Sequence, residues 1–242
     1  FGPLCSQTHA VMPAFTMKKI DTTVAPASAY LGALGLTTGL TAYFGIVDVG
    51  QVKKGDTVVV SGAAGAVGSV AGQIARLSGA SKVIGIAGGA HKSKFLVDDL
   101  KFDAAIDYKN ENVAARLDEL APDGINVFYD NVGGDILDDV LMRIVEGSRI
   151  VICGGISQYE NMDDVRGPKN YMKLAERHAT MEGFAVFHFA EHYARAEKHL
   201  ADWLRSGELV VREQIEHGVE NFPAVMNLLM TGGHYGKLLL KV

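Results

Sequence analysis

The chain has 242 residues, of which 48% are hydrophobic and 21% are charged, and its formal net charge is -5. This length and balance fit one large soluble α/β domain and exclude two ordinary domains joined by linkers. The acidic charge, without local runs of Lys and Arg, argues against nucleic acid as a partner, and no apolar run is long enough for a membrane span.

The first half of the chain predicts alternating strands and helices. Residues 24–35, rich in small side chains, predict a helix that leads into the core. Short β-branched runs then predict buried strands at 57–61, 82–87, 104–107, 127–130 and 149–153. Amphipathic stretches between them predict helices at 65–77, 91–100, 112–120 and 134–145. Because this alternation needs a parallel sheet covered on both faces, we expect a doubly wound α/β architecture, the Rossmann fold.

The alternation loosens after residue 154, where a polar segment at 157–169 is long enough to predict a functional loop. Beyond it we expect helices at 171–179, 191–206 and 221–231 and strands at 181–187, 210–217 and 238–242. Asn221 is the expected N-cap of the last helix. The chain then divides into a connecting segment (1–36), a dinucleotide-binding domain (37–209) and a C-terminal segment (210–242).

A glycine-rich turn at residues 62–68 follows the first strand of this alternation and precedes its first helix. Its sequence is Gly62-Ala63-Ala64-Gly65-Ala66-Val67-Gly68. Gly65 would let the backbone approach a pyrophosphate, Gly68 would let helix and strand pack closely, and the amides at the helix start, including Ala66 and Val67, would meet the negative charge. An ordinary tight turn is the alternative, which the flanking strand and helix disfavour. The turn therefore predicts a dinucleotide site.

The end of the second strand predicts which dinucleotide is bound. An NAD-specific protein has an acid there to bind the ribose hydroxyls, but this chain has Ala87. Gly88 and Gly89 leave room for a 2′-phosphate, and Lys92 and Lys94 follow within one helical turn. NADPH is therefore expected rather than NADH. Either lysine could instead be an ordinary solvated side chain, and Lys94 is the stronger case for that alternative.

Several motifs together resemble one family. They are Gly39-Leu40-Thr41-Ala42-Tyr43, the glycine-rich turn, Asp130-Asn131-Val132-Gly133-Gly134, Cys153-Gly154-Gly155-Ile156-Ser157-Gln158-Tyr159 and Gly236-Lys237. This combination resembles the zinc-independent medium-chain dehydrogenases and reductases, in the branch of prostaglandin, alkenal and curcumin reductases. The resemblance covers residues 18–242. It implies an enzyme that uses NADPH to reduce the carbon-carbon double bond of an α,β-unsaturated ketone or aldehyde.

The resemblance also assigns cofactor contacts residue by residue. It implies that Lys92 binds the 2′-phosphate, Tyr108 the adenosine phosphate side and Asn131 the nicotinamide ribose. The remaining implied cofactor contacts are Cys153, Gly154, Ile156, Phe184, Val186 and Gly236. Phe184 and Val186 would line the nicotinamide, although residues of an apolar strand are as readily part of the core.

Tyr159 falls where the family's active-site tyrosine lies. A phenol near the substrate carbonyl could donate a hydrogen bond as hydride reaches the β-carbon and charge builds on the enolate oxygen. The alternative is a loop tyrosine that only packs its ring. At a further position the family usually shows Asn two residues before its Gly-Lys pair, whereas this chain has His234.

Metal chemistry is not expected. The zinc-dependent members of the superfamily place a Cys or an acid where this chain reads Leu34-Gly35-Leu36-Thr37, and the histidines show no metal-ligand spacing. The two cysteines, Cys5 and Cys153, are far apart in sequence, which excludes a disulfide scaffold and suits a reducing cytosol.

Family members carry an additional N-terminal GroES-like β domain, and only its last strand would fit in residues 1–19. We therefore expect residues 1–36 to be a remnant of that domain and residues 210–242 to return toward it. Two alternatives to the enone reductase stay open: a zinc-free quinone reductase and a non-catalytic NADPH-binding protein. A homodimer is also expected, because the apolar strand at 181–187 would otherwise expose a long sheet edge.

Overall fold

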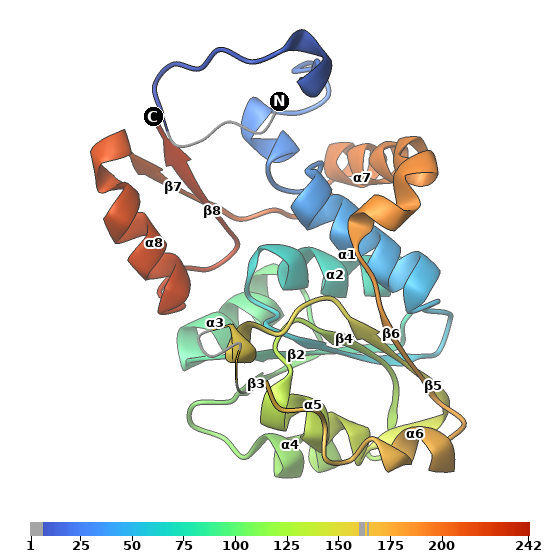
Figure 1. Ribbon diagram of the computed structural model, residues 1–242. Helices are drawn as coiled ribbons and strands as arrows, with labels where there is room; N and C mark the ends of the chain where they lie inside the picture. The colour runs from blue at the N-terminus through green and yellow to red at the C-terminus, as the bar shows by residue number, and fades with distance from the viewer. Residues whose placement is uncertain (1–6, 160–162, 164) are drawn as a thin grey trace.

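The computed structural model describes residues 7–159, 163 and 165–242. Its centre is a six-stranded sheet with the order β3-β2-β1-β4-β5-β6, and every neighbouring pair is parallel (Figure 1). The strands are β1 (Thr57–Ser61), β2 (Lys82–Ala87), β3 (Ala104–Asp107), β4 (Ile125–Asp130), β5 (Ile144–Ile152) and β6 (Thr180–Gly183). The predicted doubly wound fold is confirmed.

Helices cover both faces of this sheet, and the alternation of side chains along each strand explains why. In β1, Val58 and Val60 point into one apolar cluster and Val59 into another. The first cluster contains residues of α1 (Thr41–Phe44), α2 (Ala66–Leu77) and α7 (Tyr193–Ser206), and the second contains residues of α4 (Val113–Leu120) and α5 (Gly134–Leu141). Two further short helices, α3 (Ala90–Lys94) and α6 (Met172–Glu176), complete the layers.

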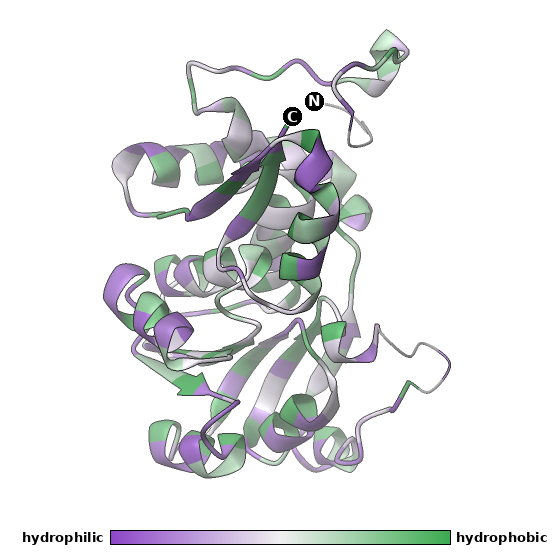
Figure 2. Cartoon of the chain, turned by 90° about the vertical axis from the view of Figure 1, so that its left-hand side faces the viewer, coloured by the Kyte–Doolittle hydropathy of each residue, from purple (hydrophilic) through white to green (hydrophobic). Residues whose placement is uncertain are grey.

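The C-terminal segment forms a small unit of its own. Strands β7 (Glu213–His217) and β8 (Lys237–Lys241) make a two-stranded parallel sheet, and α8 (Phe222–Met230) connects them. Figure 2 shows that β8 is mostly hydrophobic and β7 mostly hydrophilic. Asn221 is the residue before α8, as predicted, but its side chain does not cap the helix: the amide nitrogen donates to the carbonyl oxygen of His217 at 2.7 Å.

Several predicted elements differ from the structure, among them the strand expected at 149–153, which already starts at Ile144. The helix expected at 24–35 is only a short 3-10 turn, Ala27–Tyr30, whereas a continuous helical segment runs from Leu36 through α1 to Val49 with π-helical turns at both ends. The strand expected at 181–187 ends at Gly183, and a 3-10 helix begins at Val186. The helix expected at 134–145 ends at Leu141 because β5 already starts at Ile144. Strand β6 is an edge strand, but it is shorter than the long edge on which the expected dimer depended.

Candidate functional site

A cavity of about 990 Å³ lies at the carboxyl ends of the central strands. Its walls come from the segments that follow β1, β2, β3, β4 and β5, and from the turn after α8. The strand order reverses between β1 and β4, and in open α/β sheets ligands bind in the crevice at this kind of switch point. The volume is at the upper end of the range for small-molecule and cofactor sites.

The glycine-rich turn forms one wall of the cavity, and its glycines are there for steric reasons. Gly62 has a φ of +57°, in the left-handed region that favours glycine. A Cβ on Gly68 would lie 2.4 Å from the carbonyl oxygen of Gly62 and 2.8 Å from the Cα of Ala63. Gly65 is the residue before α2. The backbone amides of the first turn of α2, which have no partner within the helix, therefore lie at the cavity. This cradle fits the pyrophosphate of a dinucleotide.

A buried carboxylate holds the wall that follows β4. Asp130 is only 1% exposed, and its Oδ1 accepts hydrogen bonds from the hydroxyl of Ser61 at 2.7 Å and from the backbone nitrogens of Val132 at 2.9 Å and Gly133 at 3.0 Å. Burial raises the pKa of Asp130 above its ordinary value. The side-chain amide of Asn131 donates to the carbonyl oxygen of Ser61 at 2.7 Å. Asn131 is thereby fixed in the cavity wall, between β1 and β4.

Tyr159 lies on the segment that follows β5. The backbone nitrogens of Cys153 and Gly154 donate to the carbonyl oxygen of Asp130 at 2.9 and 3.1 Å, which ties this segment to β4. The nitrogen of Gly155 donates to the hydroxyl of Tyr159 at 3.2 Å. Tyr159 lines the cavity and is 54% exposed, so its hydroxyl proton is available to a ligand. Loss of solvent around the partly buried thiol raises the pKa of Cys153, so it is not an activated nucleophile.

Lys92 and Tyr108 lie at the other end of the cavity. The Lys92 ammonium donates to the carbonyl oxygen of Gly232 at 2.8 Å, and burial, followed by the nearby charge of Lys109, lowers its pKa. Tyr108 is half exposed in the loop after β3. Ala87 also lines the cavity, and it is buried and without charge where an NAD-specific protein would have its acid.

The turn after α8 closes the cavity from the C-terminal unit. The backbone nitrogen of Gly236 donates to the carbonyl oxygen of Ala64 at 2.8 Å, and Gly236 forms a β-bridge with Gly65. His234 lines the cavity, and burial lowers its pKa. No motif in the sequence indicates a functional role for the neighbouring wall residues, which are Leu229, Met230, Thr231 and Gly232.

Most of the residues that the sequence singled out surround this one cavity. Those that line it are Gly65, Ala66, Val67, Gly68, Lys92, Tyr108, Asn131, Cys153, Gly154, Ile156 and Tyr159. Gly236 contacts the glycine-rich turn but is not among the lining residues. Phe184 and Val186 do not line the cavity either: both pack with the apolar cluster that contains Phe44, and Val186 is 6% exposed. Both side chains belong to the core here, and their contact with the nicotinamide stays a prediction.

Two further findings concern the described residues as a whole. Residues 7–159, 163 and 165–242 contain no group of three or more His, Cys, Asp or Glu side chains that could hold a metal ion. Over the same residues, none of the helices has the length and apolar character needed to cross a bilayer. Cys5 and residues 160–162 and 164 of the predicted loop lie outside the described residues.

Comparison with known proteins identifies the family. Residues 66–203 match the family model described as zinc-binding dehydrogenase. The chain is 46% identical, over its full length, to YfmJ of Bacillus subtilis (strain 168), provisionally named an NADP-dependent oxidoreductase. It is 38% identical, over 96% of its length, to the NADP-dependent 2-alkenal reductase of Nicotiana tabacum. The relatives agree with the predicted cofactor.

A solved structure is similar as well. The NADPH complex of CurA from Vibrio vulnificus matches 90% of this chain with a TM-score of 0.84 and 38% identity. The chain spans 71% of the length of YfmJ, 67% of the tobacco enzyme and 66% of the CurA chain. The family match covers more than half of the chain, and the similarity to YfmJ covers all of this chain. Together they show that this chain belongs to the zinc-binding dehydrogenase family, among its medium-chain reductases.

Proposed function

We propose that this protein is an NADPH-dependent reductase of the carbon-carbon double bond in α,β-unsaturated ketones or aldehydes. The observation that carries the proposal is that the glycine-rich turn, Lys92, Asn131 and Tyr159 all line the same cavity. The alkenal reductase among the relatives supports the substrate class. Bound NADPH would supply the hydride that reaches the β-carbon.

The side chains around the cavity have distinct parts in this reaction. The amides of the glycine-rich turn and of the start of α2 bind the pyrophosphate, and Lys92 binds the 2′-phosphate. Tyr159 donates a hydrogen bond to the carbonyl oxygen of the substrate as negative charge develops there. Its hydroxyl already accepts the N–H of Gly155, which orients the phenol and leaves its proton free for the substrate.

The reaction can be tested with the purified protein, NADPH and a small enone. We expect NADPH to be consumed and the saturated ketone to form, with a kcat/KM at least about tenfold higher for the enone than for a benzoquinone. Both substrates have a carbonyl oxygen that Tyr159 can bind, so the difference reports how well each one is positioned for hydride transfer. The measurement is NADPH absorbance, with product identified by mass spectrometry. A preference for the quinone would replace this proposal by a quinone reductase, and binding of NADPH without turnover of either would leave a cofactor-binding protein.

Cofactor choice gives a second prediction. Lys92→Ala should weaken NADPH binding by about tenfold to a hundredfold and leave NADH binding nearly unchanged, because one charge-assisted contact to the 2′-phosphate contributes roughly 1.5 to 3 kcal/mol. Titration of both cofactors by calorimetry measures the effect. Lys94→Ala is the matched control: Lys94 is an exposed neighbour on the same helix that pairs with Asp98 and does not line the cavity. Equal affinities for NADPH and NADH in the unmutated protein would contradict the assignment.

A further inference from the structure

The loops that follow β2 and β3 are joined by one carboxylate. Asp107, the last residue of β3, is the register partner of Ala87 at the end of β2 and is only 6% exposed. Its Oδ1 accepts hydrogen bonds from the backbone nitrogen of Gly89 at 2.6 Å and from that of Lys109 at 3.1 Å. Its Oδ2 accepts from the side-chain amide of Asn110 at 2.7 Å. Asp107 therefore links the loop after β2, through Gly89, to the loop after β3, through Lys109 and Asn110.

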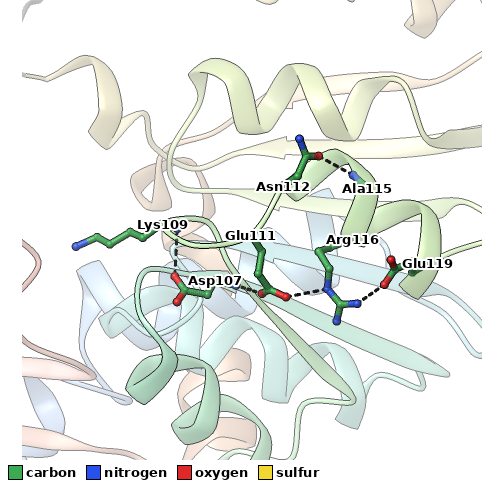
Figure 3. Close-up of polar contacts among 7 residues, drawn as sticks. All are labelled: Asp107, Lys109, Glu111, Asn112, Ala115, Arg116 and Glu119. Carbon is green, nitrogen blue, oxygen red and sulfur yellow. Dashed lines mark hydrogen bonds and ion pairs between the residues drawn. The ribbon is translucent and has the colours of Figure 1, made fainter.

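Further contacts, made by Glu111 and Arg116, hold the backbone of Asp107 in place (Figure 3). The Oε2 of Glu111 accepts the backbone N–H of Asp107 at 2.7 Å, and its Oε1 pairs with the Nε of Arg116 at 2.9 Å. Arg116 lies on α4 and also pairs with Glu119 of the same helix. At the start of α4 the side chain of Asn112 caps the helix by accepting the N–H of Ala115 at 2.8 Å. The loop after β3 is therefore fixed at both ends.

The consequence for the cavity is direct. The carbonyl oxygen of Gly89, whose N–H is bound by Asp107, accepts the backbone N–H of Lys92 at 3.0 Å. Asp107 thereby fixes the start of the helix from which Lys92 reaches the cavity. On the other loop, Tyr108 packs so closely on Gly88 that a Cβ there would lie 2.9 Å from the ring. Both side chains expected at the adenosine end depend on the same carboxylate for their position.

We propose that Asp107 is a positioning residue for NADPH selectivity, which holds Lys92 and Tyr108 in a preformed site for the adenosine 2′-phosphate end of the cofactor. The proposal rests on the proposed function. The acid that would repel a 2′-phosphate is absent at Ala87, and the acid beside it is turned onto three donors. The side-chain hydrogen bond from Asn110, together with the backbone N–H of Gly89, lowers the pKa of Asp107, so the carboxylate stays ionised and keeps these bonds at neutral pH.

The test measures binding rather than turnover, with adenosine 2′,5′-bisphosphate as a probe for this end of the cavity. Asp107→Ala should raise the Kd of NADPH and of the probe by about tenfold. The reason is that a displaced Lys92 ammonium loses much of its binding energy with the 2′-phosphate. The Kd of NADH should change by less than about threefold, since NADH lacks the 2′-phosphate. Asp107→Asn keeps an acceptor oxygen and should restore most of the affinity.

Asp103→Ala is the matched control. Asp103 precedes the opposite end of β3, where it accepts the N–H of Val83 at 2.7 Å and pairs with Arg76 at 2.6 Å, and it does not line the cavity. Its loss should lower the thermal midpoint but leave the Kd of NADPH within about twofold, because it joins the same strands far from the ligand. Asn110→Ala removes a single donor and should weaken the probe by about two- to threefold, which tests the proposal even if Asp107→Ala folds poorly.

A double-mutant cycle completes the experiment. If Asp107 acts through Lys92, the combined Lys92→Ala and Asp107→Ala variant should lose less affinity than the product of the two single losses. Unchanged binding in Asp107→Ala, an equal loss in Asp103→Ala, or tighter NADPH binding in Asp107→Asn than in the unmutated protein would each overturn the positioning role while leaving the proposed function intact. Failure of the unmutated protein to bind NADPH would overturn the proposed function, and this inference with it.

Discussion

Gly68→Ala is expected to weaken NADPH binding by about a hundredfold or more, because the added methyl group meets backbone atoms that have no freedom to rotate away. The new Cβ would lie 2.4 Å from the carbonyl oxygen of Gly62 and 2.9 Å from its carbonyl carbon. Either α2 or the glycine-rich turn must then shift. A shift of either one displaces the amides that bind the pyrophosphate, so the effect on affinity exceeds that of losing a single contact.

Two measurements separate this effect from a general loss of structure. Thermal unfolding of Gly68→Ala should show a destabilisation of about 1 to 3 kcal/mol, the usual range for an overpacked site, while calorimetry reports the affinity of the folded protein. Gly167→Ala is the control, since a Cβ at Gly167 meets no atom of the described residues within 4 Å. If Gly68→Ala binds NADPH with an affinity within about threefold of the unmutated protein, the glycine-rich turn does not bind the pyrophosphate of the cofactor.

Tyr159→Phe is expected to slow hydride transfer to an enone by about tenfold or more, and up to about a thousandfold if the phenol is the main donor to the developing oxyanion. The affinity for NADPH should be nearly unchanged, because the expected phosphate contacts come from Lys92 and the glycine-rich turn at other walls of the cavity. Removing the hydroxyl also frees the N–H of Gly155, which loses its acceptor at 3.2 Å.

Single-turnover measurement is the suitable assay, since product release could hide the effect in steady state. Tyr171→Phe provides the control: Tyr171 is a tyrosine of similar exposure, 57% against 54%, that follows the same loop and does not line the cavity. Transfer at the unmutated rate in Tyr159→Phe would reduce this tyrosine to a packing role and direct the search for a proton donor elsewhere in the cavity.

Strands β1 to β4 could be predicted because the β propensity of their residues agrees with their buried position in the sheet. In β1, the run Val58, Val59 and Val60 is β-branched and fully buried, so its bounds follow from the sequence alone. The same agreement places the glycine-rich turn between β1 and α2, and with it the larger part of the candidate site.

The helix from Leu36 to Val49 could not be predicted for the opposite reason. Gly39 and Gly45 lower the helix propensity of this segment, yet the fold requires them. A Cβ at Gly39 would lie 1.6 Å from the carbonyl oxygen of Ala33, and one at Gly45 would lie 2.4 Å from the ring of Tyr129. Close packing against the preceding turn at Ala33 and against Tyr129 of β4 outweighs helix propensity here, and neither contact is recorded in the hydrophobic pattern of the segment. The cavity wall at Leu229 to Gly232 was missed on similar grounds, because only the docked C-terminal unit brings it to the glycine-rich turn.

The contact between the C-terminal unit and the glycine-rich turn has a consequence for the energetics of the whole chain. The N–H of Gly236 donates a hydrogen bond to the carbonyl oxygen of Ala64, and the ammonium of Lys92 donates one to the carbonyl oxygen of Gly232. The two units therefore meet where the dinucleotide is expected to bind. Local opening of the C-terminal unit would remove one wall of the binding site, and any ligand that requires this wall must favour the closed form by thermodynamic linkage. Amide hydrogens of β8 should therefore exchange more slowly as cofactor concentration rises, although no atom of that strand lines the cavity.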